Sequence, residues 1–504
     1  MACPVMGGVH ATGTPGATVW VLRGTVHPMT RIHELSALDL AAAIRGGEVS
    51  ALEVTVDALE RSEGLGPTIG AFIHLAHQQA LTSAAALDAH PRTAQGSPLR
   101  GVPCPIKGLT MVQGMPWAVG SRVFAGQTAT LDDGVTQLLR GAGTVMTGLT
   151  TVPEFGLPCY TEPDDQPAAR TPWDPSRSAG GSSGGAAAAV AAGLTPIAHG
   201  SDGGGSIRIP ASVCGLVGLK PSRGRVSPGP HGTDGVALST HGVLSRTVRD
   251  TAAGIDVLSA HWPGDGYLLP DPHTSFLARC WVPPERLRIG VLTRPSNVDT
   301  EVHPACLRAV DKAVAVLEGL GHHVAEAPAP YAPDRWAAFI DLWSVMALGA
   351  PVPADREQEL RPLTRWLREH GRSVTGVAHA AAVQRAQQLS RDTAVAWQGF
   401  DVILTPTLAQ PPARIGQLRN DDDPERDFWD QTRFTPWTST ANLCGRPSIS
   451  LPLHRERIDG IELPIGVMFT GELGHDETLL RLSVELEEAA PWPALPVPLA
   501  VEGG

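Results

Sequence analysis

Two glycine-serine segments are the residues of this sequence best suited to chemistry. They are SAGGSSGG (178–185) and SDGGGSIRIP (201–210), and each leads toward a helix. Glycine permits positive φ and close backbone approach, so several main-chain N–H groups can converge on one anion. A hydrolase needs that arrangement around the oxygen of a tetrahedral intermediate, with a serine hydroxyl beside it. The pattern therefore favours a serine hydrolase site.

Two other interpretations of these segments are weaker. Gly/Ser-rich stretches are often flexible linkers, but the flanks here are apolar and strand-like, which a solvated linker does not require. A phosphate-binding loop would need G-x-x-x-x-G-K-[ST], which is absent, and residues 200–205 lack the setting of a dinucleotide-binding βαβ unit. Nucleotide binding is therefore not favoured.

A serine nucleophile needs a base, and the base is usually histidine. None of the 18 histidines is singled out by its setting, and His199, at the end of a predicted buried strand, is expected to be structural. Lys107 ends the apolar segment GVPCPIK (101–107) in a chain with few lysines. Burial would lower its pKa, and a shift from about 10.4 to about 7.4 corresponds to roughly 4 kcal/mol. A solvated surface lysine is the ordinary alternative, so context alone does not decide for Lys107.

The elements that must position these residues indicate an α/β protein. Strands are predicted at 101–107, 195–201, 213–219 and 401–406, and a helix follows the glycines at 180–185. A longer helix is expected over 332–350, and loops over 262–285 and 410–430. We predict one large α/β domain with a central mixed sheet covered by helices. The domain is expected to span 29–490, after a disordered extension (1–28) and before a C-terminal tail (491–504).

Composition narrows the function further. The net charge of −12 argues against nucleic acid as the main partner. No apolar run is long enough for a membrane span, and no signal peptide is indicated. The seven cysteines are an odd number without a C-x-x-C pair, which argues against a zinc site or a disulfide framework. A cytoplasmic location is the simplest expectation.

Three segments taken together resemble the amidase signature family. They are GGSSGG, the D-x-G-G-S-I-R-x-P pattern at 202–210 and CGLVGLKP (214–221), and the likeness runs from about residue 30 to 490. Further family-like segments are PEFG (153–156), DVILTPT (401–407) and NLCGRPSISLP (442–452). The family's bridging serine and nucleophile lie 24 residues apart, which selects Ser182 over Ser183 as the partner of Ser206.

The resemblance implies a mechanism. Ser206 attacks the amide carbonyl, and Ser182, on a cis peptide bond, relays the proton to neutral Lys107. The backbone N–H groups of Gly203, Gly204, Gly205 and Ser206 form the oxyanion hole. Asp202 and Arg208 are expected to shape the loop. No metal or organic cofactor is implied; the partner is a small-molecule amide, and a homodimer is left open.

Two departures from the family pattern bear on rate and substrate. Gly108 stands where the family usually has Asp, and Gly203 replaces a bulkier residue. Trp117, Phe155, Tyr160 and Trp343 are candidates for a substrate pocket, as is Met346. We expect apolar or aryl linear amides as substrates, with esters also cleaved. The competing hypotheses are a glutaminase-type subunit of a tRNA-dependent amidotransferase and a non-catalytic protein that kept the fold.

Overall fold

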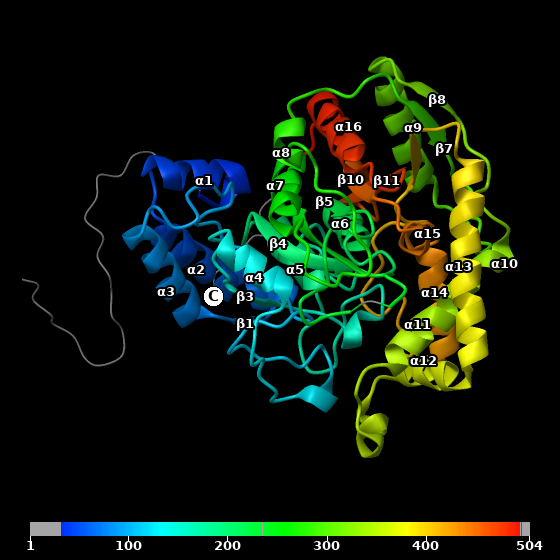
Figure 1. The fold of residues 1–504 in the computed structure, drawn as a ribbon, viewed down its shortest axis with the longest axis horizontal. Coiled ribbons are helices and arrows are strands. Elements are labelled where there is room, and N and C mark those ends of the chain that lie inside the picture. The colour runs from blue at the N-terminus through cyan, green and yellow to red at the C-terminus, as the bar shows by residue number, and fades with distance from the viewer. Residues whose placement is uncertain (1–31, 234, 494, 496–504) are drawn as a thin grey trace, which may run out of the picture.

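The computed structural model describes residues 32–233, 235–493 and 495. The predicted extension at 1–28 and most of the predicted tail at 491–504 lie outside the described residues. Within the described ranges, helices and strands surround one large sheet (Figure 1). This architecture confirms the predicted fold class, an α/β domain whose central mixed sheet is covered by helices.

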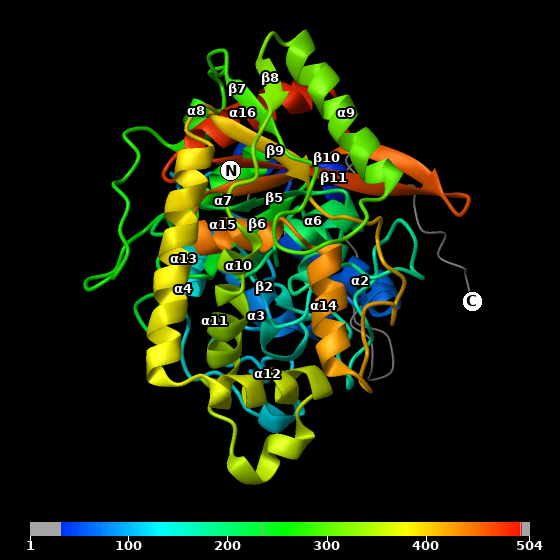
Figure 2. The ribbon, with the colours of Figure 1, turned by 90° about the vertical axis from the view of Figure 1, so that its right-hand side faces the viewer.

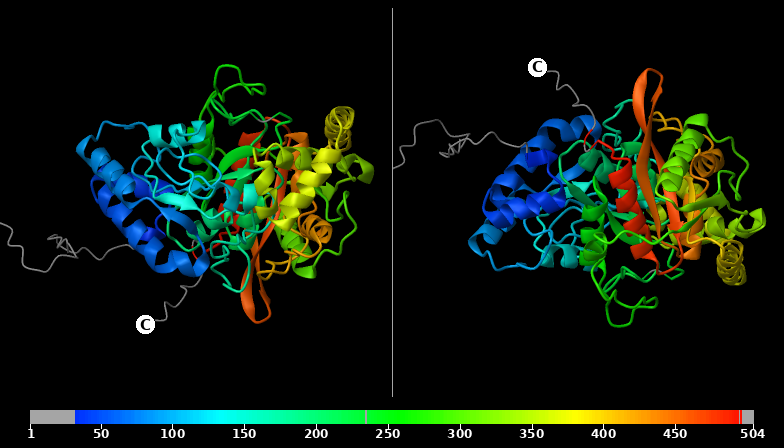
Figure 3. Two further views of the ribbon diagram at one scale, coloured as in Figure 1. Left: turned by 90° about the horizontal axis from the view of Figure 1, so that it is seen from below. Right: turned by 90° about the horizontal axis from the view of Figure 1, so that it is seen from above.

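The central sheet has eight strands in the order β4-β6-β5-β10-β11-β9-β7-β8. Neighbouring strands are antiparallel from β4 to β9, and the β9–β7 and β7–β8 pairs are parallel. The β10–β11 hairpin extends well beyond the body of the molecule (Figure 3). The strands of this sheet are β4 (Ile197–Asp202), β5 (Val217–Lys220), β6 (Thr240–Ser245), β7 (Arg288–Val291), β8 (His323–Glu326), β9 (Val402–Pro406), β10 (Ser448–Ile458) and β11 (Ile461–Gly471).

A second, three-stranded sheet lies near the N-terminal helices. Its order is β1-β3-β2, with β1 (Phe72–Leu75), β3 (Gly148–Thr150) and β2 (Ile106–Lys107). The prediction of a strand over 101–107 was too long, because Pro103 and Pro105 have no N–H to donate to a ladder. Only Ile106 and Lys107 pair with β3, which places Lys107 at the end of this sheet.

Apolar cores lie on both faces of the central sheet. On one face, side chains of β5, β9, β10 and β11 pack against α7, α9 and α16. On the other face, the alanine-rich α5 and the short α6 bury nearly every side chain. The helices of these two layers are α5 (Gly184–Ala191), α6 (Arg208–Cys214), α7 (Val248–Leu258), α8 (Phe276–Arg279), α9 (Pro304–Gly319) and α16 (Asp476–Ala489).

The remaining helices form two groups outside the sheet. The N-terminal group packs beside the small sheet, and in the other group α13 and α14 stand on either side of α11 (Figure 2). The first group is α1 (Ala37–Gly46), α2 (Ala51–Ile69), α3 (His77–Ala89) and α4 (Gly134–Gly141); the second is α10 (Pro333–Trp336), α11 (Ala338–Leu348), α12 (Pro362–Ser373), α13 (Gly376–Ala396), α14 (Pro424–Phe434) and α15 (Thr438–Cys444). Short 3-10 helices are η1 (Ile32–Glu34), η2 (Arg122–Phe124), η3 (Glu154–Gly156) and η4 (Ala354–Glu359).

Further sequence predictions of secondary structure were wrong in part. Residues 213–219 were expected to form one strand, but α6 continues to Cys214 and ends at Gly215, whose φ of 71° is left-handed. The predicted loop over 410–430 contains the start of α14. The Asp423 side chain accepts from the N–H of Arg426, and Pro424 occupies the first turn, which together start a helix.

Candidate active site

Lys107 lies fully buried at the end of β2, with its ammonium group turned toward the glycine-serine segments. Its Nζ donates to Ser182 Oγ at 2.8 Å and to the carbonyl oxygen of Ser201 at 3.0 Å. Burial lowers the pKa of Lys107 to about 7, and the charge of Asp202 opposes that shift only in part. A substantial fraction of Lys107 is therefore a neutral amine near neutral pH, able to accept a proton.

Ser182 occupies a crowded backbone position just before α5. The Gly181–Ser182 peptide bond is cis, as the family resemblance implied. Gly156, at a φ of 69°, lies so close that a Cβ there would sit 3.1 Å from Ser182 Oγ and 2.6 Å from a Leu109 methyl group. The absence of a side chain at Gly156 therefore leaves room for the Ser182 hydroxyl beside Lys107.

Ser206 lies between β4 and α6, and its side chain is only 7% exposed. Ser182 and Ser206 line one cavity of about 140 Å³, together with Gly203 and Trp343. The neighbouring Ser183 instead forms hydrogen bonds with backbone carbonyl groups. Its N–H donates to the carbonyl of Ser206 at 3.2 Å, and its hydroxyl donates to the carbonyl of Ser201 at 3.3 Å. Lys107 thus contacts one of two serines that line the same cavity.

A fully buried ion pair fixes the loop that carries Ser206. Arg208 donates from Nε and Nη2 to the two carboxylate oxygens of Asp202, at 2.9 and 2.8 Å. That contact holds the pKa of Asp202 well below its usual range, against the opposing effect of burial. Bidentate pairing of this kind fixes orientation as well as charge. The expected loop-shaping role of Asp202 and Arg208 agrees with this geometry.

Sequence reasoning gave no role to the residues of α15 that support this loop. Asn442 donates from Nδ2 to the backbone carbonyl of Asp202 at 3.0 Å and accepts from Arg208 Nη2 at 2.7 Å. Thr438 donates to the carbonyl of Gly204 at 2.6 Å. The available signal was the segment NLCGRPSISLP, which carries the family resemblance but no spacing that points to residues 202–206.

The four backbone N–H groups predicted to form the oxyanion hole differ in whether they are already hydrogen-bonded within the protein. The N–H of Gly205 donates to Asp202 Oδ1 at 2.8 Å, so the prediction for Gly205 needs correction. The Gly205 N–H group is therefore already bonded to the carboxylate that stabilises the loop. Within the described residues, the N–H groups of Gly203, Gly204 and Ser206 donate to no other protein group. These three donors remain free for an anion.

The two glycines that depart from the family pattern fill crowded positions. A Cβ on Gly108 would lie 2.8 Å from the carbonyl oxygen of Thr150, and a Cβ on Gly203 would lie 2.7 Å from Ser239 Oγ and 3.1 Å from the ring of Trp343. Neighbouring atoms occupy the space that larger residues would take. Neither glycine therefore leaves a void at the site.

Three of the five predicted pocket residues line a cavity at the site, and two do not. Phe155, Trp343 and Met346 line the cavity that contains Ser182 and Ser206. Tyr160 is a correction. It is buried in the core against α5, and its hydroxyl donates to Asp427 at 2.7 Å, because a buried phenol needs an acceptor. Trp117 also lies outside these cavities.

A narrow aromatic cavity of about 50 Å³ adjoins Ser206 on another side. It shares Ser206, Leu157 and Trp343 with the first cavity. Its other aromatic walls, which sequence reasoning missed, are Trp336, Phe339 and Phe428. Phe339 was open to prediction, because it precedes Trp343 by one helical turn in the expected helix 332–350. Trp336 and Phe428 could not be placed without the tertiary packing of α10 and α14.

A larger cavity of about 940 Å³ also borders the site. It shares Leu109, Ser201, Ser239 and Met346 with the cavity of the two serines. Most of its remaining lining comes from β6, from the 226–240 segment before it and from α11. The two serines therefore lie between a small aromatic cavity and a large, more polar one.

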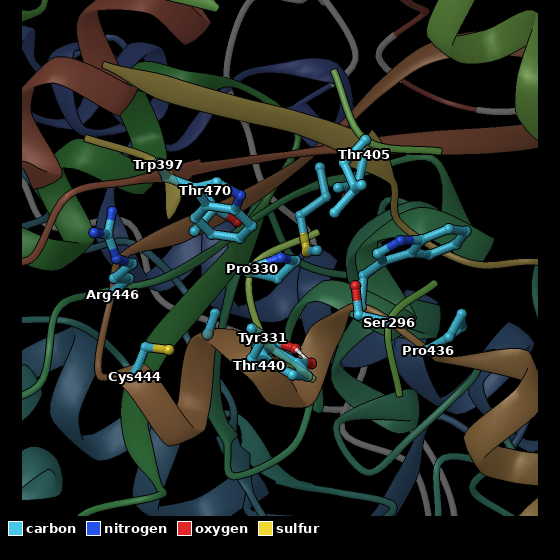
Figure 4. Close-up of a pocket in the computed structure, with 14 residues that line it drawn as sticks. Ser296, Pro330, Tyr331, Trp397, Thr405, Pro436, Thr440, Cys444, Arg446 and Thr470 are labelled. Atoms are coloured by element: carbon cyan, nitrogen blue, oxygen red, sulfur yellow. Dashed lines mark hydrogen bonds between the residues drawn. The ribbon is translucent and has the colours of Figure 1, made fainter. Parts of the chain in front are cut away.

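A separate cavity is lined in part by residues of α15 (Figure 4). It is lined by Tyr331, Thr405, Trp437 and Thr440 among others, and by none of the predicted site residues. Its volume of about 20 Å³ suits roughly one water molecule. The buried Thr405 hydroxyl and Trp437 N–H, which have no hydrogen-bond partner among the described residues, would suit such a water.

Comparison with known proteins places this site in a family. The family model described as Amidase matches residues 53–480. The chain is 36% identical over 478 residues to 6-aminohexanoate-cyclic-dimer hydrolase of Paenarthrobacter ureafaciens, covering 90% of this chain and 94% of the relative.

Solved structures agree with the family match. A structure of 6-aminohexanoate cyclic dimer hydrolase complexed with substrate superposes with a TM-score of 0.84 at 32% identity, over 93% of this chain and 100% of that one. A bacterial aryl acylamidase of the amidase signature family gives 0.80 at 26% identity, over 92% and 98%.

Fold, site and comparisons define a hydrolase that acts on carboxylic amides. The chain belongs to the amidase family, the amidase signature enzymes. Its reaction is the hydrolysis of an amide C–N bond, and the glutaminase-type alternative is not favoured. In the described residues no helix combines the length and the apolar character that a membrane crossing requires.

Proposed function

We propose that this amidase works through an acyl-enzyme on Ser206, with Ser182 and Lys107 as the proton relay. One observation carries the proposal: Lys107 Nζ lies 2.8 Å from Ser182 Oγ, and Ser182 shares its cavity with Ser206. A neutral lysine that reaches one serine and, through it, a second serine can activate a hydroxyl without histidine.

The proposed reaction has two halves. Ser206 Oγ attacks the amide carbonyl carbon while its proton passes to Ser182 and the Ser182 proton passes to Lys107 Nζ. The resulting oxyanion accepts hydrogen bonds from the N–H groups of Gly203, Gly204 and Ser206. The proton returns by the same route to the leaving nitrogen as the C–N bond breaks. Water then attacks the ester carbonyl of the acyl-enzyme, and Ser206 leaves with its proton restored.

The substrate we propose is a small-molecule amide with an apolar or aryl group beside the scissile bond. The aromatic walls next to Ser206 favour such a group, since flat apolar groups gain most from burial against rings. The printed names of the relatives, a cyclic-dimer hydrolase and an aryl acylamidase, also support apolar or aryl amides. Esters should react at the same site, since an alcohol leaves more readily than an amine.

The proposal also covers the domain boundaries and the location of the protein. We propose that residues 29–490 form the amidase domain and 491–504 a tail. A cytoplasmic location rests on the cysteine pattern of the sequence.

The test is hydrolysis of p-nitroacetanilide by wild type and by Ser206→Ala, followed as p-nitroaniline release. Loss of the nucleophile should reduce kcat by about 10⁴- to 10⁶-fold. Intact mass after rapid quenching with a p-nitrophenyl ester should show one acyl adduct on wild type and none on the variant. Equal activity of the two proteins would overturn the assignment of Ser206.

A further inference from the structure

Two histidines form a hydrogen-bonded pair beside Lys107. His199 lies on β4 and His241 on the neighbouring β6, and their rings stack with centroids 5.2 Å apart. His199 Nδ1 lies 3.3 Å from the backbone nitrogen of Lys107, and His199 Nε2 lies 3.1 Å from His241 Nδ1. The pair therefore links the backbone of Lys107 to β6.

The backbone contact fixes where the protons of both rings lie. The N–H of Lys107 can only donate, so His199 Nδ1 is the acceptor and carries no proton. The proton of neutral His199 is then on Nε2, which donates to His241 Nδ1. His241 Nδ1 is an acceptor in turn, so the proton of neutral His241 is on Nε2.

Both imidazoles are neutral at neutral pH. Burial and the like charge of neighbouring groups hold the pKa of His199 well below its usual range, and burial, with Lys107 nearby, lowers the pKa of His241 to about 4. His241 is half-buried, and it lines the large cavity beside the active site. Among the described residues, none accepts a hydrogen bond from His241 Nε2. A fixed N–H donor therefore lacks an acceptor in that cavity.

The rest of the cavity indicates what this donor could bind. Among the described residues, the lining includes Asp133 and no lysine or arginine, which disfavours a carboxylate ligand. Hydroxyls of Ser239 and Thr240 also line it, and His379 adds a second imidazole whose buried Nδ1 has no partner among the described residues. A neutral group with a carbonyl acceptor fits this lining, and an amide would also bring a donor.

We infer that His241 is a specificity-determining residue, whose Nε2–H donates to a second carbonyl group of the substrate in the large cavity. The inference rests on the proposed function, because it deepens the choice of substrate at the same site. The substrate class is then a compound with two amide groups, one bound at Ser206 and one at His241.

The test compares three amides that share a hexanamide unit. N-butylhexanamide has a single amide; 6-acetamido-N-butylhexanamide carries a second on the acyl side; N-(6-acetamidohexyl)hexanamide carries it on the amine side. In wild type, one of the two diamides should have a KM about 3- to 10-fold below that of the monoamide, the effect of one buried hydrogen bond. Butylamine release is measured for the first two compounds, and hexanoate release for the third.

Two variants distinguish the effect of the His241 N–H donor from that of its aromatic ring. His241→Phe keeps an aromatic ring but has no N–H, so the KM preference for the diamide should disappear. His241→Gln can accept from His199 and donate to the cavity, so most of the preference should remain. The monoamide serves as the reference within each protein, and thermal melting confirms that each variant is folded.

The outcomes distinguish this inference from the proposed function. Wild type that cleaves the monoamide without preferring either diamide would overturn the inference and leave the proposed function standing. An unchanged preference in His241→Phe, or a loss in His241→Gln equal to that in His241→Phe, would also overturn it. Activity retained in Ser206→Ala would instead overturn the proposed function.

Discussion

Lys107 and Lys220 are two buried lysines that differ in what surrounds them. Burial is the main cause that lowers the pKa of each side chain to about 7. Lys107 contacts a serine hydroxyl at the edge of a cavity, whereas Lys220, on β5, donates to the carbonyl of Pro221 at 2.9 Å and lines none of the cavities around Ser206. Both lysines therefore have a lowered pKa, but only Lys107 also contacts a serine that lines the cavity.

Arg208 completes the comparison. It is as buried as Lys107, but both oxygens of Asp202 pair with its guanidinium. The carboxylate of Asp202 offsets the buried charge of Arg208, whereas Lys107 meets hydroxyl and carbonyl groups and loses its proton readily. In the proposed mechanism, Arg208 holds the loop and neutral Lys107 moves protons.

The largest expected effect follows from replacing each lysine by methionine. Lys107→Met removes the base and should reduce kcat for p-nitroacetanilide by about 10⁴-fold, as losses of other catalytic bases do. Lys220→Met keeps the shape of a buried chain and should change kcat by less than about threefold. Equal losses in two folded variants would mean that burial, and not contact with Ser182, distinguishes these lysines.

A smaller loss is expected at the serine between base and nucleophile. Ser182→Ala breaks the path from Ser206 to Lys107 and should lower kcat by about 10²- to 10⁴-fold. Ser183→Ala is the matched control, because Ser183 is equally buried but bonds to backbone carbonyl and not to Lys107. Steady-state kinetics of both variants would contradict the relay if Ser183→Ala proved the more damaging.

The loop scaffold should show a mixed effect on stability and rate. Asn442→Leu leaves polar atoms of Asp202 and Arg208 without a partner, which costs about 1–3 kcal/mol of unfolding free energy. Because the same contacts orient residues 203–206, we also expect a kcat loss of about 10-fold. Urea denaturation and kinetics measure the two effects. A variant with normal stability and normal kcat would show that α15 does not support the loop.

The smallest effect concerns stability alone. The folded-state pKa of Lys220, about 7, lies below the ordinary value of 10.5, so folding releases a proton between these pH values. The cost of burial is then greatest below pH 7 and falls as pH rises toward 10. Lys220→Met should stabilise the protein by about 1–3 kcal/mol at pH 7 and by less at pH 9. Denaturation at the two pH values would refute this if the gain grew with pH.

The part of the site that could be predicted consists of residues whose chemical role is indicated by the sequence immediately around them. The glycine-serine segments, the apolar stretch before Lys107 and the family spacing led to Lys107, Ser182 and Ser206. In the structure Lys107 bonds to Ser182, and the two serines line one cavity. Likewise, the strands and helices with strong periodicity led to the fold class.

The residues that escaped prediction depend on contacts between distant segments. Asn442 and Thr438 reach residues 202–204 from more than 200 positions away, and nothing in their own neighbourhood indicates it. Gly205 was assigned to the oxyanion hole because it follows two other glycines, but the neighbouring Asp202 carboxylate takes its N–H. Tyr160 has the right side chain for a pocket, yet Asp427 of α14 holds its hydroxyl in the core.

The pH dependence of kcat/KM, measured for wild type and Lys220→Met on p-nitroacetanilide, tests the central claim most directly. Since the proposed base is the neutral form of Lys107, activity should rise with pH through one ionisation near 7 and then level off. The same profile should appear in Lys220→Met. A wild-type profile that is flat or falls across this range, or one that loses its ionisation in Lys220→Met, would contradict the account of Lys107 as the base.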